Sequence, residues 1–280
     1  MKMNAKGITL LFVVLVAVTT GTASGQSWNH DPSSQIGPNH WGFLGGDYNS
    51  FATCGSIVGT GTLLTEVGKK QAPVDIASGS ATISVLQDID FRFSDTPFVV
   101  ENTGHVVEVS SGKGSEIRIG PDLPDHYQLQ QFHFHTPSEH IINASLSDAE
   151  LHLVHQNALG ELAVVAVLLR IDDVHANPLF DRIMFEAPIS PGDRDLGGEI
   201  NPAHLLPESR SYYTYTGSLT TPPCTEGVRW FVMAQSVAIS KAAVDRLHLV
   251  VRMFPDYGGY RNNNRPVRML NERPVLFNPQ

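Results

Sequence analysis

The sequence predicts a β-rich α+β protein of one domain, in which a large sheet carries peripheral helices. Three observations support this fold class. Apolar or alternating runs recur along the chain and are separated by turn signals. Helical periodicity occurs in only two places. The 280 residues are 41% hydrophobic and 17% charged, a globular composition with no break that would mark a second domain.

The strand-like segments can be taken in chain order. They cover residues 105–109, 115–119, 127–135, 150–155, 162–171 and 228–235. One helix is predicted near Leu179–Glu186, and a second over Lys241–Met253 with Ser240 as its N-cap. Residues 26–75 are rich in Gly, Ser, Asn and Pro and predict an irregular segment.

The first residues have the pattern of a cleaved secretory signal rather than of a membrane anchor. Lys2 and Lys6 precede an apolar run, Ile8–Val18, and small residues follow. We expect residues 1–25 to be removed and 26–280 to form the domain, exported to the periplasm or secreted. Losing two lysines changes the net charge from −9 to −11, which argues against nucleic acid or an anionic membrane as partner.

The chain has two cysteines, Cys54 and Cys224. In an exported protein an even pair predicts one disulfide, although two free buried thiols are the alternative.

Histidines concentrate in QLQQFHFHTPSEH, residues 128–140. Residues i and i+2 of a strand share a face, so Gln131, His133 and His135 point the same way. In the segment ELHLVH, Glu150 and His152 share a face for the same reason. If the two strands are neighbours, His133, His135 and His152 converge, which is the ligand set of a catalytic zinc site with an open fourth position. Gln131 and Glu150 are then placed to accept hydrogen bonds from the ligands.

Two alternatives weigh against this interpretation. An HxH pair alone arises by chance, and HFHTPSE also fits the HxHxxxE metal motif of cupins, with Glu139 as a ligand. The second cupin motif is missing downstream, which weakens the case for a cupin. His140 and His155 are expected to be buried structural histidines.

Several segments resemble the α-class carbonic anhydrases, in particular the exported bacterial type. They are GPNHW (37–41), QAPVDI (71–76), QFHFH (131–135), SEH (138–140), ELHLVH (150–155), YTGSLTTPP (215–223) and NRP (264–266). The resemblance runs from about Trp28 to the C-terminus. It implies a mostly antiparallel twisted sheet surrounded by helices, and the reversible hydration of CO2 to bicarbonate and a proton by a zinc-bound hydroxide.

The resemblance also implies roles for single residues. Zn2+ is held by the three histidines, Thr220 accepts a hydrogen bond from the hydroxide and donates its own hydrogen in a hydrogen bond to Glu139, and His105 is the proton shuttle. Gln131, Glu150, Tyr215 and Asn263 are implied to support the site, Tyr215 by orienting the Thr220 region. An apolar pocket for CO2 is implied at Val154, Val164, Leu219, Thr221, Val228 and Trp230.

The chain departs from the family pattern in three places. Glu108 lies near the expected shuttle and could raise the pKa of His105 by charge attraction. Residues 54–76 are longer than in short bacterial-type members and predict a surface loop or hairpin. His30 stands where a tyrosine is usual. A non-catalytic carbonic-anhydrase-like binding module and an esterase using the same site are the competing functions, and a homodimer is left open.

Overall fold

Strands dominate the computed structural model, which describes residues 27–44, 51–58, 62–65, 68–112, 114–120 and 122–279. The predicted signal peptide, residues 1–25, lies outside the described residues. No helix within the described residues is long and apolar enough to cross a membrane.

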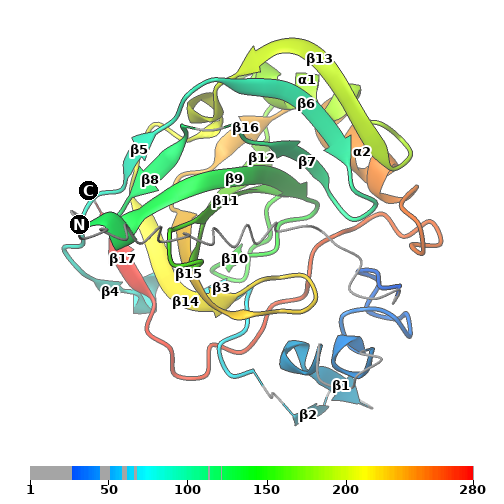
Figure 1. Cartoon of the computed structure of the whole chain (residues 1–280). Helices are drawn as coiled ribbons and strands as arrows, with labels where there is room; N and C mark the ends of the chain where they lie inside the picture. Colours follow the sequence, from blue (N-terminus) through cyan, green and yellow to red (C-terminus); the bar gives the residue numbers. More distant parts are fainter. Residues whose placement is uncertain are drawn as a thin grey trace, which may run out of the picture.

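The described residues form a large mixed sheet of thirteen strands (Figure 1). Ten of them follow one path across it: β13 (Gly192–Ile200), β6 (Thr96–Asn102), β7 (Val107–Ser110), β9 (His126–His135), β11 (Ala149–Gln156), β12 (Leu162–Ile171), β15 (Glu226–Met233), β14 (Tyr212–Ser218), β17 (Leu276–Asn278) and β4 (Thr82–Ile83). Off this path lie β5 (Asp90–Arg92), β8 (Glu116–Arg118) and β16 (Val237–Ile239). Most pairs are antiparallel, whereas β12 runs parallel to β15 and β16, and β17 parallel to β4. The expected sheet is therefore confirmed.

The centre of the sheet holds the two histidine-bearing strands side by side. β9 and β11 are antiparallel, with His133 opposite His152 and His135 opposite Glu150. Because successive side chains of a strand alternate between its faces, all four project from one face of the sheet. The neighbour relationship that the sequence interpretation required is confirmed.

The opposite face of these strands packs into the main hydrophobic core. Phe132, Phe134, Leu151 and Leu153 are fully buried there. Two helices, α1 (Pro178–Glu186) and α2 (Lys241–Val251), cover this layer, and the rings of Phe134 and Phe180 meet edge to face with centroids 6.1 Å apart. The rigid apolar layer thus fixes the direction in which the histidines point.

Both helices begin where their sequences predict. The Asn177 side chain accepts from the Leu179 N–H, and the Ser240 hydroxyl accepts from the Ala243 N–H, each at 3.0 Å. α2 ends at Val251, two residues before the expected Met253, because the following residues form a tighter turn in which Met253 N–H donates to Val250.

The N-terminal part is irregular, as expected, and contains small paired elements. β1 (Ser56–Val58) and β2 (Thr62–Thr65) form an antiparallel hairpin, so the longer segment after Cys54 adopts one of the two expected forms. β3 (Asp75–Ile76) pairs in parallel with β10 (Ile141–Ile142). Figure 1 shows the blue N-terminal segment beside the yellow loop between β14 and β15, and the Cys54–Cys224 disulfide joins these two regions.

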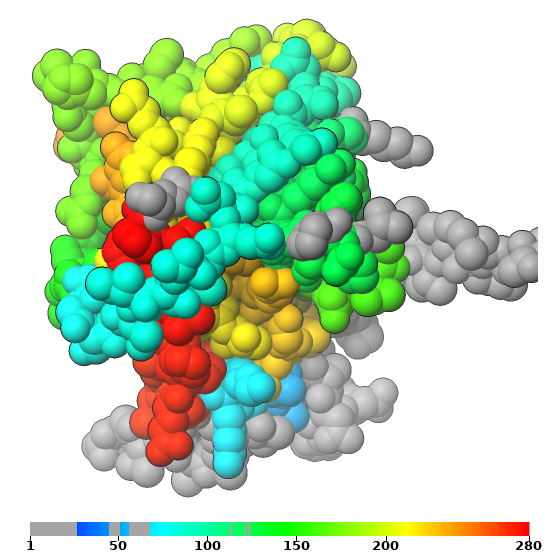
Figure 2. All heavy atoms as spheres, turned by 90° about the vertical axis from the view of Figure 1, so that its left-hand side faces the viewer, coloured from blue at the N-terminus to red at the C-terminus, as the bar shows by residue number. Residues whose placement is uncertain are grey.

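The sequence interpretation missed several strands, among them β6, β13 and β14, and placed one residue wrongly. His105 was expected in a strand, but β7 begins only at Val107. Gly104 adopts a φ of 88° and Thr103 N–H donates to the Val106 carbonyl, which closes a turn that carries His105. At the far edge of the sheet, Figure 2 shows the cyan segment that contains β4 beside the red C-terminal strand β17.

Candidate metal centre

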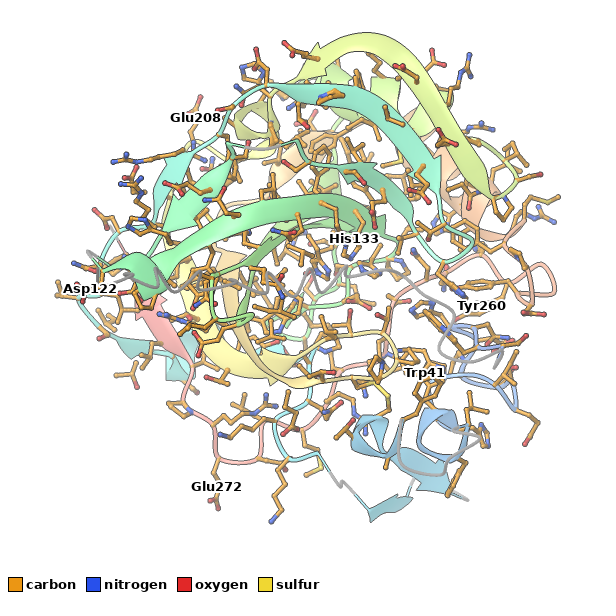
Figure 3. The ribbon with its side chains drawn as sticks, in the orientation of Figure 1. Trp41, Asp122, His133, Glu208, Tyr260 and Glu272 are labelled. Atoms are coloured by element: carbon orange, nitrogen blue, oxygen red, sulfur yellow. A yellow bond between two sulfur atoms is a disulfide. The ribbon has the colours of Figure 1, made fainter. Side chains whose placement is uncertain are left out.

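Three imidazoles converge on one face of the sheet. His133, His135 and His152 each offer a ring nitrogen, and these three atoms lie within 4.8 Å of one another. The ring centroids are 4.7 to 5.2 Å apart. His135 and His152 are buried and His133 is partly exposed, so the cluster opens to one side. Figure 3 shows the labelled His133 near the end of β9.

The second nitrogen of each ring is held by a hydrogen-bond acceptor. His133 Nδ1 lies 2.8 Å from Gln131 Oε1, His135 Nδ1 lies 2.7 Å from the Asn263 carbonyl, and His152 Nε2 lies 2.8 Å from Glu150 Oε1. When these nitrogens donate, the free lone pairs are Nε2 of His133 and His135 and Nδ1 of His152. The three supporting partners predicted at Gln131, Glu150 and Asn263 are therefore in contact with the predicted ligands.

A zinc ion fits this donor set. His135 Nε2 is buried and has no hydrogen-bond partner among the described residues, which is unusual for a buried polar atom. Burial, helped by the charges of the neighbouring histidines, lowers the pKa of His133, and burial lowers that of His135. Neutral imidazoles are what a metal requires, and three of them with an open side match a catalytic zinc site.

Glu150 is the charged residue that holds the predicted ligand His152 in place. Its Oε2 accepts from the backbone N–H groups of Glu139 and His140, both at 2.7 Å, and its Oε1 lies 2.6 Å from His140 Nδ1. Burial alone raises the pKa of Glu150, but His140 and His152 outweigh burial and lower it well below its ordinary value. The carboxylate is therefore charged and fixes the ring of His152.

Tyr215 and His140 extend this support. The Tyr215 hydroxyl lies 2.7 Å from His140 Nε2, so His140 is a buried, hydrogen-bonded structural histidine, as expected. Tyr215 was expected to orient the Thr220 region; its hydroxyl instead reaches His152 through His140 and Glu150. His155 is buried as expected, but neither of its ring nitrogens has a hydrogen-bond partner within the described residues.

Glu139 and Thr220 are buried near the cluster without contacting each other through a hydrogen bond. Glu139 Oε1 accepts from the Arg265 N–H at 2.7 Å, while Glu139 Oε2 has no partner in the described part of the chain. The expected hydrogen bond from the Thr220 hydroxyl to the Glu139 carboxylate therefore stays a prediction. Glu139 is not a member of the group whose ligand atoms all lie within 4.8 Å of one another, although its Oε2 is 4.0 Å from His152 Nδ1.

An apolar wall borders the cluster on the side of His152. Val154, Val164, Val228 and Trp230 belong to one buried group, and Leu219 packs against it. The Trp230 ring centroid lies 4.9 Å from that of His152. The pocket residues proposed for CO2 are thus brought together beside a predicted ligand, and the sixth, Thr221, is half-buried next to Leu219 and Thr220.

The loop that carries Thr220 is fixed at several points. Leu219 N–H donates to Thr225 at 2.9 Å, and Cys224 N–H donates to Thr221 at 2.9 Å. The predicted disulfide Cys54–Cys224 is present and closes a sequence separation of 170 residues. The Thr53 hydroxyl also donates to the Pro223 carbonyl at 2.7 Å, so the N-terminal segment clamps this loop.

His105 lies apart from the three-imidazole cluster, packed on the N-terminal segment. Its ring stacks on Trp28 with centroids 3.8 Å apart. Burial lowers its pKa to about 4, and the charge that opposes this shift is that of Asp256. The expected contribution of Glu108 does not appear at His105, where the charge that raises the pKa is that of Asp256; Glu108 is itself buried, and its own pKa is raised to about 7 by burial and by Glu101.

Sequence reasoning did not find Tyr257 or Arg265 as contributors. Tyr257 hydrogen-bonds His30, the residue in place of the usual tyrosine, across 227 residues of chain. Arg265, in the NRP segment, is fully buried and donates to the Ala72 carbonyl at 2.7 Å as well as to Glu139. A tyrosine in a polar stretch gives no local signal, whereas the NRP motif marked the region of Arg265 without giving its contacts.

Comparison with known proteins places these features in a family. Residues 60–279 match the family model described as eukaryotic-type carbonic anhydrase. A carbonic anhydrase of Nostoc sp. is 34% identical over 275 residues, covering 96% of this chain and 94% of the relative. The solved α-carbonic anhydrase of Thermovibrio ammonificans, in complex with the inhibitor sulfanilamide, matches with a TM-score of 0.77 and 34% identity over 90% of this chain and 99% of that one. An α-carbonic anhydrase of Photobacterium profundum matches with a TM-score of 0.74 and 34% identity, over 89% and 100% of the chains.

Proposed function

The chain belongs to the α-class, eukaryotic-type carbonic anhydrases, and we propose that His133, His135 and His152 hold the zinc ion at which it hydrates CO2. The enzyme class and the substrate pair, CO2 and bicarbonate, follow from the family. The observation that carries the assignment of ligands is the cluster of three ring nitrogens within 4.8 Å, each on a ring whose other nitrogen is hydrogen-bonded.

Zinc, when bound, lowers the pKa of a coordinated water enough to provide hydroxide at neutral pH, an effect for which carbonic anhydrases are the standard example. The protein residues act around that nucleophile. Glu150 keeps His152 oriented, and the neutral rings of His133 and His135 supply lone pairs. Thr220 is proposed to orient the nucleophile, with Glu139 as acceptor of the Thr220 hydrogen, because Glu139 Oε2 is a buried acceptor that lacks a partner among the described residues.

The apolar wall is proposed to hold CO2, an uncharged and apolar substrate. Val154 lies two residues after His152 on the same strand face, and Trp230 packs against the His152 ring. A wall without charged groups excludes water from the reacting carbon. Such a wall also binds the bicarbonate anion weakly, which favours release of the product.

His105 is proposed to take up the proton released by hydration. Its Nδ1 is buried without a partner among the described residues, and Asn263 connects its backbone to the predicted ligands: Asn263 Nδ2 donates to the His105 carbonyl at 3.1 Å, while the Asn263 carbonyl accepts from His135. A pKa near 4 makes His105 a weak acceptor at neutral pH in this packed position.

Metal analysis combined with stopped-flow CO2 hydration tests the proposal. We expect one zinc per chain and hydration that is lost, together with zinc, in His152→Ala. His204→Ala, at an exposed histidine, is the matched control and keeps both. A zinc-free, folded wild-type protein without hydration activity would indicate a binding module instead and would overturn the assignment.

We propose that residues 1–25 are a signal peptide, that 26–280 are one domain, and that the enzyme is periplasmic or secreted. The disulfide supports an oxidising compartment. Fractionation with N-terminal sequencing of the mature protein tests this: a chain that still begins at Met1 contradicts it. Light scattering of the same sample separates a monomer from a homodimer.

A further inference from the structure

Three carboxylates lie in a row that leads from the edge of the sheet to the predicted ligands. Asp193 of β13 is directly opposite Glu101 of β6, and Glu101 is opposite Glu108 of β7. Glu108 is in turn opposite His133 of β9. Figure 1 shows these four strands in the same order, from β13 at the top to β9 near the centre. Because directly opposite residues project from the same face, Asp193, Glu101 and Glu108, here called the acidic row, share the face of the three imidazoles.

The acidic row becomes more enclosed toward the metal centre. Asp193 is exposed, Glu101 is half-buried and Glu108 is only 8% exposed. Neighbouring strands are about 4.8 Å apart, so the backbones of these three residues lie about 14, 10 and 5 Å from that of His133. His133 is the predicted ligand that is partly exposed. The row therefore approaches the three histidines at the ligand that borders solvent.

The carboxylates of the row have no cation to pair with among the described residues. None of the ion pairs in that part of the chain involves Asp193, Glu101 or Glu108. Arg194 follows Asp193, but it projects from the other face of β13 and pairs with Glu186 at 2.9 Å. Glu108 Oε2 is buried and has no hydrogen-bond partner within the described residues. Buried polar atoms normally have a partner, so this oxygen points to a ligand.

The arrangement is unfavourable for the fold alone. Like charges directly opposite each other destabilise a sheet, and Glu101 and Glu108 form such a pair. Their side chains interact, since the charge of Glu101 contributes, after burial, to the raised pKa of Glu108. A cation between the two carboxylates replaces repulsion by attraction. Carboxylate oxygens bind zinc as well as harder divalent ions such as Mn2+.

We propose that the acidic row captures divalent cations from solvent and passes them to the three histidines, with Glu101 and Glu108 as a transient carboxylate site. The histidines are neutral and exert no long-range attraction on a cation, whereas a line of one charge sign raises the local concentration of the opposite sign. The ion exchanges carboxylate oxygens for imidazole nitrogens, and no covalent bond changes. This inference rests on the proposed function, because the destination of the cation is the zinc centre.

Manganese tests the acidic row without zinc. Mn2+ prefers oxygen ligands, and it broadens the NMR signals of nearby nuclei. In zinc-free wild-type protein, the amide signals of Glu101 and Glu108 are expected to broaden at a lower Mn2+ concentration than that of Glu199, an exposed glutamate at the other end of β13. The triple variant Asp193→Asn/Glu101→Gln/Glu108→Gln should lose this preference. Broadening no stronger at the row than at Glu199 would overturn the proposal.

Stopped-flow uptake of zinc by the zinc-free protein tests the transfer. The measurement is made at pH 8, above the pKa of about 7 of Glu108. At low salt Glu101→Gln should slow uptake about fourfold, the effect in water of one charge on a divalent cation about 10 Å away. The triple variant should be slower by roughly tenfold or more. Glu199→Gln removes the same charge from β13 outside the row and should take up zinc like the wild type. The amides keep the side-chain shapes, and circular dichroism checks that each variant is folded.

Release and salt dependence separate capture from support of the bound metal. A charge outside the ligand set steers association, so release of zinc to a chelator should be unchanged in Glu101→Gln. The difference in uptake between wild type and triple variant should shrink from about 10 mM to 1 M salt, as the Debye length falls from about 30 to 3 Å. Equal uptake rates, or faster release with unchanged uptake, contradict the proposal. A wild type that takes up no zinc would instead remove the proposed function, whereas manganese broadening still decides whether the row holds cations.

Discussion

The imidazole of His105 lies flat on the indole of Trp28, with ring centroids 3.8 Å apart and the two planes 5° from parallel. This contact covers one face of the predicted shuttle, which is half-buried, and burial lowers its pKa to about 4. The resting arrangement therefore favours the neutral ring over a range of pH in which an exposed histidine would be partly charged.

Removing the indole should restore the pKa of His105. In Trp28→Ala we expect the pKa to rise from about 4 toward the ordinary 6.5, because the ring regains solvent. Titration of the His105 ring protons by NMR measures the change directly, and kcat in dilute neutral buffer should rise with it. Phe43→Ala, at an exposed aromatic residue in the same segment, is the control. A His105 that still titrates near 4 in Trp28→Ala would show that the stack is not what buries it.

Asp256, not Glu108, should set the electrostatic part of that pKa. Asp256 raises the pKa of His105 by charge attraction, so Asp256→Asn is expected to lower it further. Because Asp256 is exposed, the difference should shrink as salt is added. Glu108→Gln should leave the pKa of His105 unchanged. The same NMR titration checks both variants, and the reverse ranking would restore the role first expected for Glu108.

Neutralising Glu150 should weaken metal binding. Glu150→Gln removes the charge that accepts from His152 and His140, so zinc affinity is expected to fall roughly 10- to 100-fold, as for other partners of metal-bound histidines. Competition with a chromogenic chelator measures the affinity. Glu199→Gln, an exposed glutamate on β13, should bind zinc like the wild type. Unchanged affinity in Glu150→Gln would mean that the carboxylate only stabilises the fold.

His155 should make the protein sensitive to acid. Burial lowers its pKa to about 3, so between pH 6.5 and 3 the unfolded chain binds one more proton than the folded chain. The free energy of unfolding therefore decreases as pH falls through this window, by up to about 5 kcal/mol from this group. Above pH 6.5 the contribution vanishes.

Replacing His155 by leucine removes this term and two unsatisfied buried nitrogens. We expect the acid-unfolding midpoint of His155→Leu, followed by circular dichroism, to move to lower pH, with no loss of stability at pH 8. His204→Gln, at an exposed histidine, is the control. An unmoved midpoint would place the acid sensitivity elsewhere.

Opening the disulfide should cost stability throughout the chain. The Cys54–Cys224 bond closes 170 residues, and the chain-entropy model gives an upper figure of about 5 kcal/mol for a loop of that length. Urea unfolding of Cys54→Ser/Cys224→Ser against the oxidised wild type measures the loss. The reduced wild type should match the variant, and an unfolding free energy equal to that of the oxidised protein contradicts the prediction.

Local periodicity was sufficient to predict the two strands that carry the ligands, β9 and β11. In residues 131–135 of β9 and 150–153 of β11 one face carries Phe or Leu and the other carries His with Gln or Glu, so alternation over these short stretches predicted the strands, their faces and the three ligands. The disulfide followed from the cysteine count and the leader pattern. Both inferences depended on contrasts between residues close in sequence, or on chemistry that has few alternatives.

Other features had no such local contrast. β13, with the sequence GDRDLGGEI, is an edge strand that is mostly exposed on both faces, so no alternation marks it. His105 was placed in a strand because the valines after it favour one, whereas Gly104 turns the chain first. The pairing of His30 with Tyr257 joins residues 227 positions apart, and only tertiary packing brings such residues together.

The carbonyl that holds His135 belongs to Asn263, near the C-terminal end of the chain. During synthesis, all three histidines are therefore made long before Asn263, whose carbonyl accepts the hydrogen bond from His135. If the enzyme is exported in an unfolded form, loading of the cation must await arrival on the far side of the membrane. The supply of zinc in that compartment, rather than in the cytosol, would then determine how much of the enzyme becomes active.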